Sequence, residues 1–359
     1  MSVGLIMAGG LGKRLWPESS VTHPKHLLNL VGRESFLQAA YRRASHLFGR
    51  ENTFLVIREE LREAVVSQLP ELPADSIIAE PQGKDTAPCI GFASVWVRRR
   101  KGDDSMVVLP ADHIIRDEER FAEIISVAAR QAKKGLLVTI GIKPTRAETG
   151  YGYLEIGNKL GDLDGIPLFE VKRFTEKPSH KKAKEFFEQG SFLWNAGIFA
   201  WTPSTILEQM ELHLPELYQG LIRIEEALGT KDEQRVIREV YPSLPKISID
   251  YGIMEKVSSV VAVPGDFFWD DIGDWKALER VLSKDKAGNI IRGLVEERES
   301  SNCILINREN KILGAIGLSD VIIINTEKGI LVVRKEEAQK VKELVNELLK
   351  DEKLKKYLQ

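Results

Sequence analysis

Short apolar runs alternate with longer amphipathic segments along the N-terminal part of the chain. The runs are bounded by turn residues and apolar almost throughout, as expected for strands buried on both faces. The segments between them carry apolar residues three or four positions apart, which predicts helices. This alternation predicts a doubly wound, mostly parallel α/β sheet. The expected strands are 3–8, 53–57, 77–79, 106–109 and 136–140, and the expected helices are 36–48, 59–69, 87–100 and 121–133.

The pattern changes after Thr149, where glycine- and aromatic-rich strand material at 150–153 and 171–174 precedes a helix at 181–189. A second change near residue 285 leads into β-rich segments, so we expect a catalytic domain at 1–285 and a small β-rich domain at 286–359. That domain ends in an amphipathic helix, which either docks onto its own domain, the interpretation we favour, or forms a subunit contact. Its apolar stripe consists of Val341, Leu344, Val345, Leu348 and Leu349.

Charge and cysteine usage exclude several classes of protein. The chain has 359 residues, with 51 Lys and Arg against 53 Asp and Glu, a formal net charge of -2. No global basic field attracts nucleic acid or a membrane surface. Cys89 and Cys303 are far apart, which argues against a disulfide framework and structural zinc. The first apolar run is too short for a membrane span and lacks signal-peptide flanks, so we expect a cytoplasmic protein.

A glycine-rich segment with three cations follows the first expected strand. It runs from Ala8 to Pro17 as AGGLGKRLWP and is followed by Pro24-Lys25. The glycines allow sharp turns that point N–H groups at an anion, and the cations supply the positive charge that a triphosphate requires. An ordinary turn with solvated basic residues is the alternative. The segment matches neither the P-loop nor the dinucleotide fingerprint. The candidate nucleotide-binding residues here are Ala8, Gly9, Gly10, Gly12 and Lys13, and the candidate catalytic residues are Arg14 and Lys25.

This segment resembles the signature of the sugar-nucleotide pyrophosphorylases, which reads G-G-x-G-x-R-L-x-P and then P-K. Further segments of that family follow in the expected order over most of the chain, and they resemble its mannose branch. The resemblance implies a Rossmann-like, glycosyltransferase-A-like fold in which the loop wraps a triphosphate. The matching segments are EP at 80–81, TAP at 86–88, LPADH at 109–113, FTEKP at 174–178, WNAGIF at 194–199, SIDYGIMEK at 248–256 and WDDIG at 269–273.

Glu80, Asp85 and Thr86 are the candidate residues for the base. Glu80 matches the family's base-binding glutamate, and a carboxylate can accept from both N1–H and the exocyclic amine of guanine. A solvent-facing Glu-Pro pair at a strand end is the alternative interpretation. The chain departs from the mannose branch at Lys84-Asp85, where Arg or Lys followed by Asn is usual, so the role of Asp85 stays open.

Asp112 and Asp271 are the candidate metal ligands. Asp112 follows an expected strand, and in open α/β sheets ligands lie beyond the carboxyl ends of strands. Mg²⁺ that bridges phosphate oxygens needs only one or two protein carboxylates. Asp271 is the partner by resemblance, although the residues alone do not separate it from Asp270 and an aspartate-capped surface turn is also common for this pattern. His113 is expected to be a structural hydrogen-bonding residue.

The candidate sugar-phosphate residues are Gly150, Tyr151, Glu176, Lys177 and Asn195. By resemblance, Lys177 grips the phosphate of the sugar, although a Glu-Lys-Pro segment alone is more often a solvated loop. A glycine backbone lets a sugar ring approach closely, while Glu176 and Asn195 offer hydrogen-bonding groups to its hydroxyls.

The resemblance implies a Mg²⁺-dependent enzyme that transfers the GMP group of GTP to mannose 1-phosphate and releases pyrophosphate, with a homodimer as a possible assembly. The phosphate oxygen that attacks is already ionised, so positioning and charge neutralisation suffice for catalysis. Three alternatives remain: a pyrophosphorylase for another base or hexose, a non-catalytic subunit that senses a sugar nucleotide, and a dinucleotide-dependent oxidoreductase, which the missing glycine fingerprint disfavours.

Overall fold

The computed structural model describes residues 1–358 and divides the chain into two compact units. The first unit comprises residues 1–9 and 40–270, and the second comprises residues 10–39 and 271 onward. The second unit therefore contains most of the glycine-rich segment together with the C-terminal part of the chain. The division into contiguous domains 1–285 and 286–359 stays a prediction.

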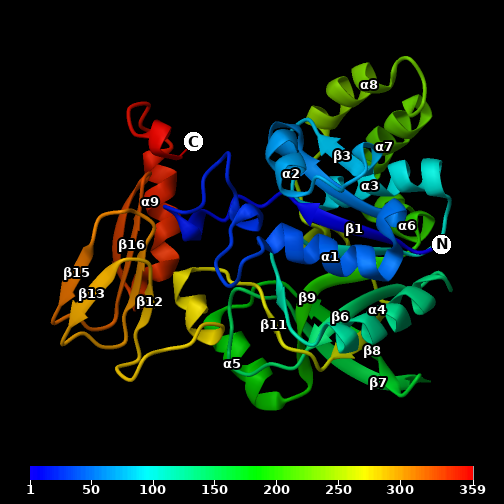
Figure 1. Cartoon of the computed structure of the whole chain (residues 1–359). Coiled ribbons are helices and arrows are strands. Elements are labelled where there is room, and N and C mark those ends of the chain that lie inside the picture. The colour runs from blue at the N-terminus through cyan, green and yellow to red at the C-terminus, as the bar shows by residue number, and fades with distance from the viewer. Residues whose placement is uncertain (359) are drawn as a thin grey trace. The chain divides into compact units, whose positions relative to one another are not determined.

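The first unit is built on a nine-stranded sheet (Figure 1). All its strands except β8 and β9 run in the same direction, as the pairings of neighbouring strands require. The mostly parallel α/β sheet is thereby confirmed. In spatial order the strands are β3 (Ile77–Glu80), β2 (Thr53–Arg58), β1 (Val3–Ala8), β4 (Met106–Pro110), β9 (Phe192–Trp201), β6 (Leu137–Ile142), β10 (Val260–Gly265), β8 (Ile166–Thr175) and β7 (Tyr153–Leu163).

Helices cover both faces of this sheet, which explains why its first strands are apolar throughout. On one face, Val3 and Leu5 join a core shared with α3 (Thr86–Lys101), α6 (Pro203–His213) and α7 (Pro215–Ala227). On the other face Gly4 lies against Phe48 of α1 (Phe36–Phe48), since a Cβ at Gly4 would come within 2.5 Å of that ring. Alternate residues of β1 therefore point to opposite helical layers.

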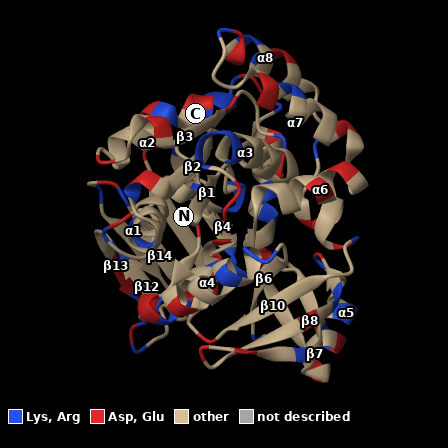
Figure 2. Cartoon of the chain, turned by 90° about the vertical axis from the view of Figure 1, so that its right-hand side faces the viewer, with Lys and Arg blue, Asp and Glu red and all other residues tan. Residues whose placement is uncertain are grey.

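The remaining helices of this unit match the expected amphipathic segments and add three that were not predicted. The helices near expected positions are α2 (Arg62–Gln68), α4 (Glu118–Ala132) and α5 (His180–Gln189). The additions are α6, α7 and α8 (Glu233–Val240), and acidic and basic residues are interspersed along the ribbons of α7 and α8 (Figure 2). The segment 150–152, expected to be strand material, is a loop that leads into β7 at Tyr153.

The second unit contains two short sheets made of successive coils. One has the order β12 (Ile290–Arg292), β14 (Ile304–Asn307), β16 (Val321–Thr326) and β17 (Gly329–Arg334), and the other pairs β13 (Val295–Arg298) with β15 (Leu313–Ile316). All these pairings are parallel except β16 with β17. The β-rich C-terminal part with its terminal helix is confirmed.

The terminal helix α9 (Val341–Leu348) buries a narrower stripe than its sequence predicted. Val341 and Val345 are buried, whereas Leu344 is 39% exposed. The helix packs against the short helix η1 (Lys13–Leu15) and against η9 (Lys335–Lys340) of the same unit. The contact with η9 is docking within residues 286–359, which the sequence favoured, whereas η1 lies in the part of the chain expected to form the catalytic domain.

Candidate active site

The glycine-rich segment begins where β1 ends, and the chain passes from the first unit to the second between Gly9 and Gly10. Gly12 adopts a left-handed conformation with φ of 63°, and a Cβ there would lie 2.4 Å from the Cβ of Lys25. Both the backbone conformation and the close approach require glycine at this position. Gly12 therefore brings the two cationic parts of the segment, at Lys13–Leu15 and Lys25–Leu27, next to each other.

The three cations of this segment have different surroundings. Lys25 is buried, donates to the backbone carbonyl of Asp271 and lies 5.7 Å from the centre of the Phe36 ring. Lys13 Nζ donates to Asn346 Oδ1 of α9 at 2.8 Å. The Nε atom of Arg14 is buried and has no hydrogen-bond partner among residues 1–358. An unsatisfied buried donor on a cation is costly, and an anion bound at this loop would satisfy it.

Asp271 is the first residue of the second unit after the chain leaves β11 (Trp269–Asp270). Asp270 is buried with 3% exposure, whereas Asp271 is partly exposed. Ile272 has a positive φ of 42°, an unusual conformation for a β-branched residue that turns the chain sharply after Asp271. Of the two aspartates, Asp271 is thus the one with access to solvent.

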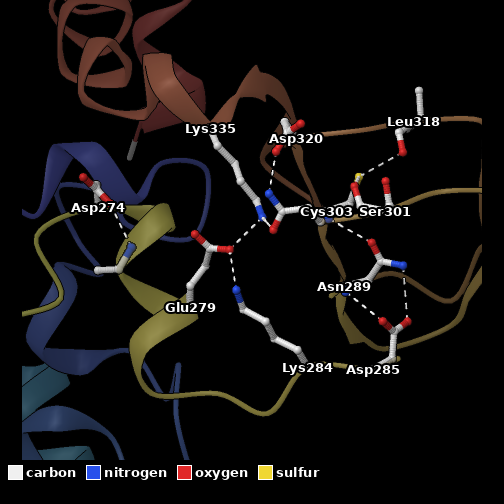
Figure 3. A network of polar contacts seen from close by, with 12 residues as sticks. Asp274, Glu279, Lys284, Asp285, Asn289, Ser301, Cys303, Leu318, Asp320 and Lys335 are labelled. Carbon is white, nitrogen blue, oxygen red and sulfur yellow. Dashed lines mark hydrogen bonds and ion pairs between the residues drawn. The ribbon is translucent and has the colours of Figure 1, made fainter. Parts of the chain in front are cut away.

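A network of polar contacts fixes the segment that follows Asp271 (Figure 3). Asp274 caps the short helix η8 (Trp275–Arg280) by accepting from the N–H of Ala277 at 2.9 Å. At the other end of η8, Glu279 accepts from Nζ of Lys335 at 2.7 Å and from Nζ of Lys284 at 2.9 Å. Only 5% of the Lys335 side chain is exposed. These contacts anchor the segment beside the β-rich coils of its own unit.

In the first unit Asp112 follows β4, whose last residue Pro110 pairs with Met7 of β1. The strand β5 (Ile114–Ile115) then pairs with β11, so that Ile114 faces Asp270. His113 between them is buried, and its Nδ1 accepts from Nε1 of Trp269 at 3.1 Å. His113 thus makes the kind of structural hydrogen bond expected from the sequence.

Glu80 lies at the carboxyl end of β3 and is almost completely buried, with 3% exposure. The alternative interpretation, in which Glu80 faces solvent, is therefore wrong. Oε1 of Glu80 accepts from the hydroxyl of Tyr241, while its Oε2 lies next to the glycine segment, 3.9 Å from where a Cβ of Gly9 would stand. Burial raises the pKa of Glu80 to about 7, although hydrogen bonds from Tyr241 and Cys89 oppose the rise.

Asp85 and Thr86 have local structural partners. Asp85 is the N-cap of α3, has a positive φ of 73°, and accepts from the N–H of Thr86 at 2.8 Å. The hydroxyl of Thr86 accepts from the N–H of Ile249 at 2.8 Å. The Thr86 hydroxyl therefore joins the start of α3 to the segment that contains Asp250, whereas Asp85 caps the helix. The contribution of both residues to base binding stays a prediction.

Three of the expected sugar-phosphate residues, Glu176, Lys177 and Asn195, lie close to a carboxylate that was not predicted from the sequence, Asp250. Asn195 donates to Asp250 at 3.2 Å, and its own carbonyl accepts from the N–H of Gly197 and the hydroxyl of Thr139, both at 3.1 Å. Asn195 therefore orients Asp250, and its carbonyl is already used. A Cβ at Gly152 would lie 2.6 Å from Oε2 of Glu176, so glycine is needed for that carboxylate to fit.

The charged groups of this cluster shift one another's pKa values. Lys177 forms a 2.7 Å ion pair with Glu176. Burial acts to lower the pKa of Lys177, but the charge and hydrogen bond of Glu176 outweigh it and raise that pKa above its usual range. Burial, followed by repulsion from Glu176, raises the pKa of Asp250 to about 7. The two carboxylates can accept hydrogen bonds from hydroxyls, and the amine of Lys177 can contact a phosphate.

Tyr151 belongs to an aromatic cluster beside these residues. Its ring packs edge-on against Trp194 and Trp269, with ring centres 5.2 Å and 5.1 Å apart. Arg146 lies over the Trp194 ring at 5.0 Å. This cluster was missed in the sequence, because no local motif marks residues that meet only in the folded sheet. A missed partner of Glu80, Tyr241, comes from the unpredicted helical region for the same reason.

The structure thus assigns the candidate residues to two groups. The first unit contains Ala8, Gly9, Glu80, Asp85, Thr86, Asp112, Gly150, Tyr151, Glu176, Lys177 and Asn195, and the second contains Gly10, Gly12, Lys13, Arg14, Lys25 and Asp271. Residues 1–358 hold no group of three or more His, Cys, Asp or Glu side chains that could bind a metal. None of the helices in this range has both the length and the apolar composition needed to cross a bilayer.

Comparison with known proteins shows the family to which the chain belongs. A nucleotidyl transferase family model matches residues 3–288, and a model of the mannose-phosphate isomerase/GMP-like β-helix domain matches residues 295–348. A mannose-1-phosphate guanylyltransferase from Klebsiella pneumoniae is 37% identical over 99% of this chain and 76% of its own length. The alginate biosynthesis protein AlgA of Pseudomonas aeruginosa is 33% identical over 96% of this chain and 72% of its own.

A solved structure extends the likeness to three dimensions. The Thermus thermophilus protein described as a mannose-1-phosphate geranyltransferase superposes with a TM-score of 0.85 at 36% identity, covering 97% of this chain and 99% of that one. The likeness therefore includes both the sheet and the β-rich coils.

Proposed function

Because the chain belongs to the nucleotidyl transferase family, we propose that it transfers the GMP group of GTP to mannose 1-phosphate, releasing pyrophosphate and forming GDP-mannose. The choice of substrates rests on the near-full-length match to a relative named mannose-1-phosphate guanylyltransferase. The observation that carries the chemistry is the buried Nε of Arg14, which has no partner among residues 1–358 and lies in a glycine-rich loop with two further cations.

The reaction is an in-line displacement at the α-phosphorus of GTP. A phosphate oxygen of mannose 1-phosphate forms the new P–O bond as the bond to the bridging α,β-oxygen breaks, and the electron pair leaves with pyrophosphate. The nucleophile is ionised at neutral pH, so no side chain needs to remove a proton. Arg14 and Lys25 neutralise the triphosphate, and Lys177 holds the phosphate of the sugar.

Glu80 and Asp250 would act on the neutral parts of the substrates. Glu80 is the proposed acceptor for N1–H and the amine of guanine, with Asp85 as a second acceptor. Asp250 and Glu176 would accept from hydroxyls of the mannose ring, and the backbone of Gly150 and Tyr151 would line its approach. Carboxylates serve here because each accepts several hydrogen bonds without attracting a phosphate.

Asp112 and Asp271 are the proposed ligands of Mg²⁺. Their oxygen donors fit this cation, which takes one or two carboxylates and completes its shell with phosphate oxygens and water, so that a cluster of three acidic residues is unnecessary. When bound, the ion neutralises charge on the phosphoryl oxygens. The partial exposure of Asp271 favours it over the buried Asp270. The two buried thiols, Cys89 and Cys303, support the proposal of a cytoplasmic location, where thiols stay reduced.

A pyrophosphate-release assay tests this function with GTP, ATP, UTP and dTTP, each paired with the 1-phosphates of mannose, glucose and galactose. We expect the greatest kcat/KM for GTP with mannose 1-phosphate and none without a divalent cation. A preference for another pair would identify a different pyrophosphorylase. Binding of GDP-mannose without pyrophosphate release from any pair would instead identify a sensor.

A further inference from the structure

Residues of the β-rich coils bind the loop that contains Arg14 and Lys25, within the same unit. Arg308, which follows β14, forms a two-pronged ion pair with Glu18, with Nε to Oε1 at 2.7 Å and Nη2 to Oε2 at 3.2 Å. Only 8% of the Glu18 side chain is exposed. A planar guanidinium paired in this way fixes both the distance and the orientation of its partner.

A second set of contacts to the loop comes from the turn between β16 and β17. Lys328 in that turn donates to the hydroxyl of Ser20 at 2.8 Å. The next residue, Gly329, lies directly against Trp16, since a Cβ there would stand 3.0 Å from its ring. The carbonyl of Trp16 also accepts from Nε1 of Trp275 at 2.9 Å. The residues between Arg14 and Lys25 are thus held by side chains more than 200 positions away in the sequence.

These contacts leave Arg14 available for a ligand. Arg308 and Lys328 bind Glu18 and Ser20, which lie between the two cations in sequence, and neither contact uses the guanidinium of Arg14. A loop held at its middle presents its cations in one arrangement before substrate arrives. Such preorganisation reduces the ordering cost of binding an anion at its two ends.

We propose that Arg308 and Lys328 of the β-rich coils are positioning residues for the triphosphate-binding loop. This rests on the proposed function, because the loop is assigned to GTP there. The β-rich part of the chain then contributes to nucleotide use although neither residue needs to touch the nucleotide.

The test compares Arg308→Gln with Arg334→Gln, whose arginine lies in the same coils with its side chain 78% exposed and only a 3.7 Å ion pair with Glu336. We expect Arg308→Gln to raise the KM for GTP roughly tenfold while the KM for mannose 1-phosphate stays within about twofold, because misplacement of a binding loop affects the substrate that it holds. Arg334→Gln should match the wild type in both constants. Equal rises in both KM values for Arg308→Gln would overturn the proposal.

The double variant Glu18→Gln/Arg308→Gln separates positioning from stability. Arg308→Gln alone leaves the buried Glu18 charge without its main partner, which lowers the thermal midpoint of unfolding. The double variant removes that charge, so we expect the midpoint to recover while the KM for GTP stays raised. Recovery of both quantities would show that Arg308 only compensates a buried charge.

Hydrogen exchange gives a readout that needs no turnover. In the absence of substrates, amides of residues 10–28 should exchange faster in Arg308→Gln than in the wild type, and in Arg334→Gln they should not. Unchanged exchange would refute the proposal that Arg308 positions the loop, even if the enzyme makes GDP-mannose. Faster exchange in a protein that turns over no GTP would sustain that positioning and reject the proposed function instead.

Discussion

The carboxylates of the first unit and the cations of the second differ in how their surroundings treat their charge. Burial raises the pKa of Glu80 and of Asp250 to about 7, because it disfavours the ionised form of each carboxyl group. The second unit keeps Arg14 with an unsatisfied buried donor and supports the loop around it through Glu18 and Ser20. The first arrangement suits recognition of neutral N–H and O–H groups, and the second suits neutralisation of phosphate.

Asp112→Asn should have the largest effect on activity, because it removes a negative ligand from the proposed Mg²⁺ site while preserving the shape of the side chain. We expect kcat to fall by roughly a thousandfold at saturating substrates, a loss in keeping with the several kcal/mol that a bound cation supplies. The measurement is pyrophosphate release as a function of Mg²⁺ concentration. The exposed Asp75→Asn in the same unit serves as the control.

Asp271→Asn belongs to the same prediction and should behave alike. A near-normal rate in this variant, with a strong loss in Asp270→Asn, would move the second ligand to the buried aspartate. Near-normal rates at saturating Mg²⁺ for Asp112→Asn would reject the metal assignment in the first unit.

Arg14→Ala should come next, with kcat/KM for GTP lowered by about a hundredfold. A guanidinium that meets a triphosphate through charge-assisted hydrogen bonds contributes more than a neutral donor does. The KM for mannose 1-phosphate should change little, and Arg14→Lys should recover only part of the loss because an ammonium lacks the planar fork. Arg33→Ala, an exposed arginine of the same unit, is the control. A similar loss for both substrates would break the proposed division between the two units.

Lys177→Ala should show the converse pattern with a smaller effect. We expect its KM for mannose 1-phosphate to rise roughly tenfold with little change in the KM for GTP, since one exposed amine contributes about 1 to 2 kcal/mol to phosphate binding. Initial rates over a grid of both substrate concentrations measure the two constants. Lys181→Ala, also exposed in this unit, should leave both unchanged. A rise in the KM for GTP alone would place Lys177 at the triphosphate.

The sequence could predict the elements whose signal is local. The strand that ends at Glu80 and the strand that precedes Asp112 are short apolar runs, and Gly12 lies in a loop whose composition indicates phosphate binding. The grouping of that loop with the C-terminal coils could not be predicted, because the Glu18–Arg308 pair joins residues 290 positions apart. Asp250 was not predicted for a similar reason, since its selection depends on Asn195 of β9 and on Glu176 after β8, which are distant in sequence. Leu344 fits the helical stripe but is 39% exposed, because the residues of α9 that are buried are Val341 and Val345.

The smallest expected effect concerns Glu80 and its pKa. An ionised Glu80 can accept from N1–H and the amine of guanine, whereas inosine triphosphate offers only N1–H. Because the pKa of Glu80 is about 7, its acceptor form predominates above pH 7 and is lost as the pH falls below it. The kcat/KM reports ionisation in the free enzyme, so the preference for GTP over inosine triphosphate should fall about fivefold between pH 8 and pH 6.

Glu80→Gln makes that prediction specific to one carboxyl. The amide keeps one acceptor and cannot titrate, so the variant should show a reduced GTP preference that is the same at both pH values, with an unchanged KM for mannose 1-phosphate. Taking the ratio of two nucleotides cancels any titration that affects both alike, including that of Asp250. A wild-type ratio that does not vary with pH, or a variant that keeps the wild-type ratio, would mean that Glu80 serves Tyr241 and the glycine segment only. The base would then have to be recognised by Asp85 or by the backbone.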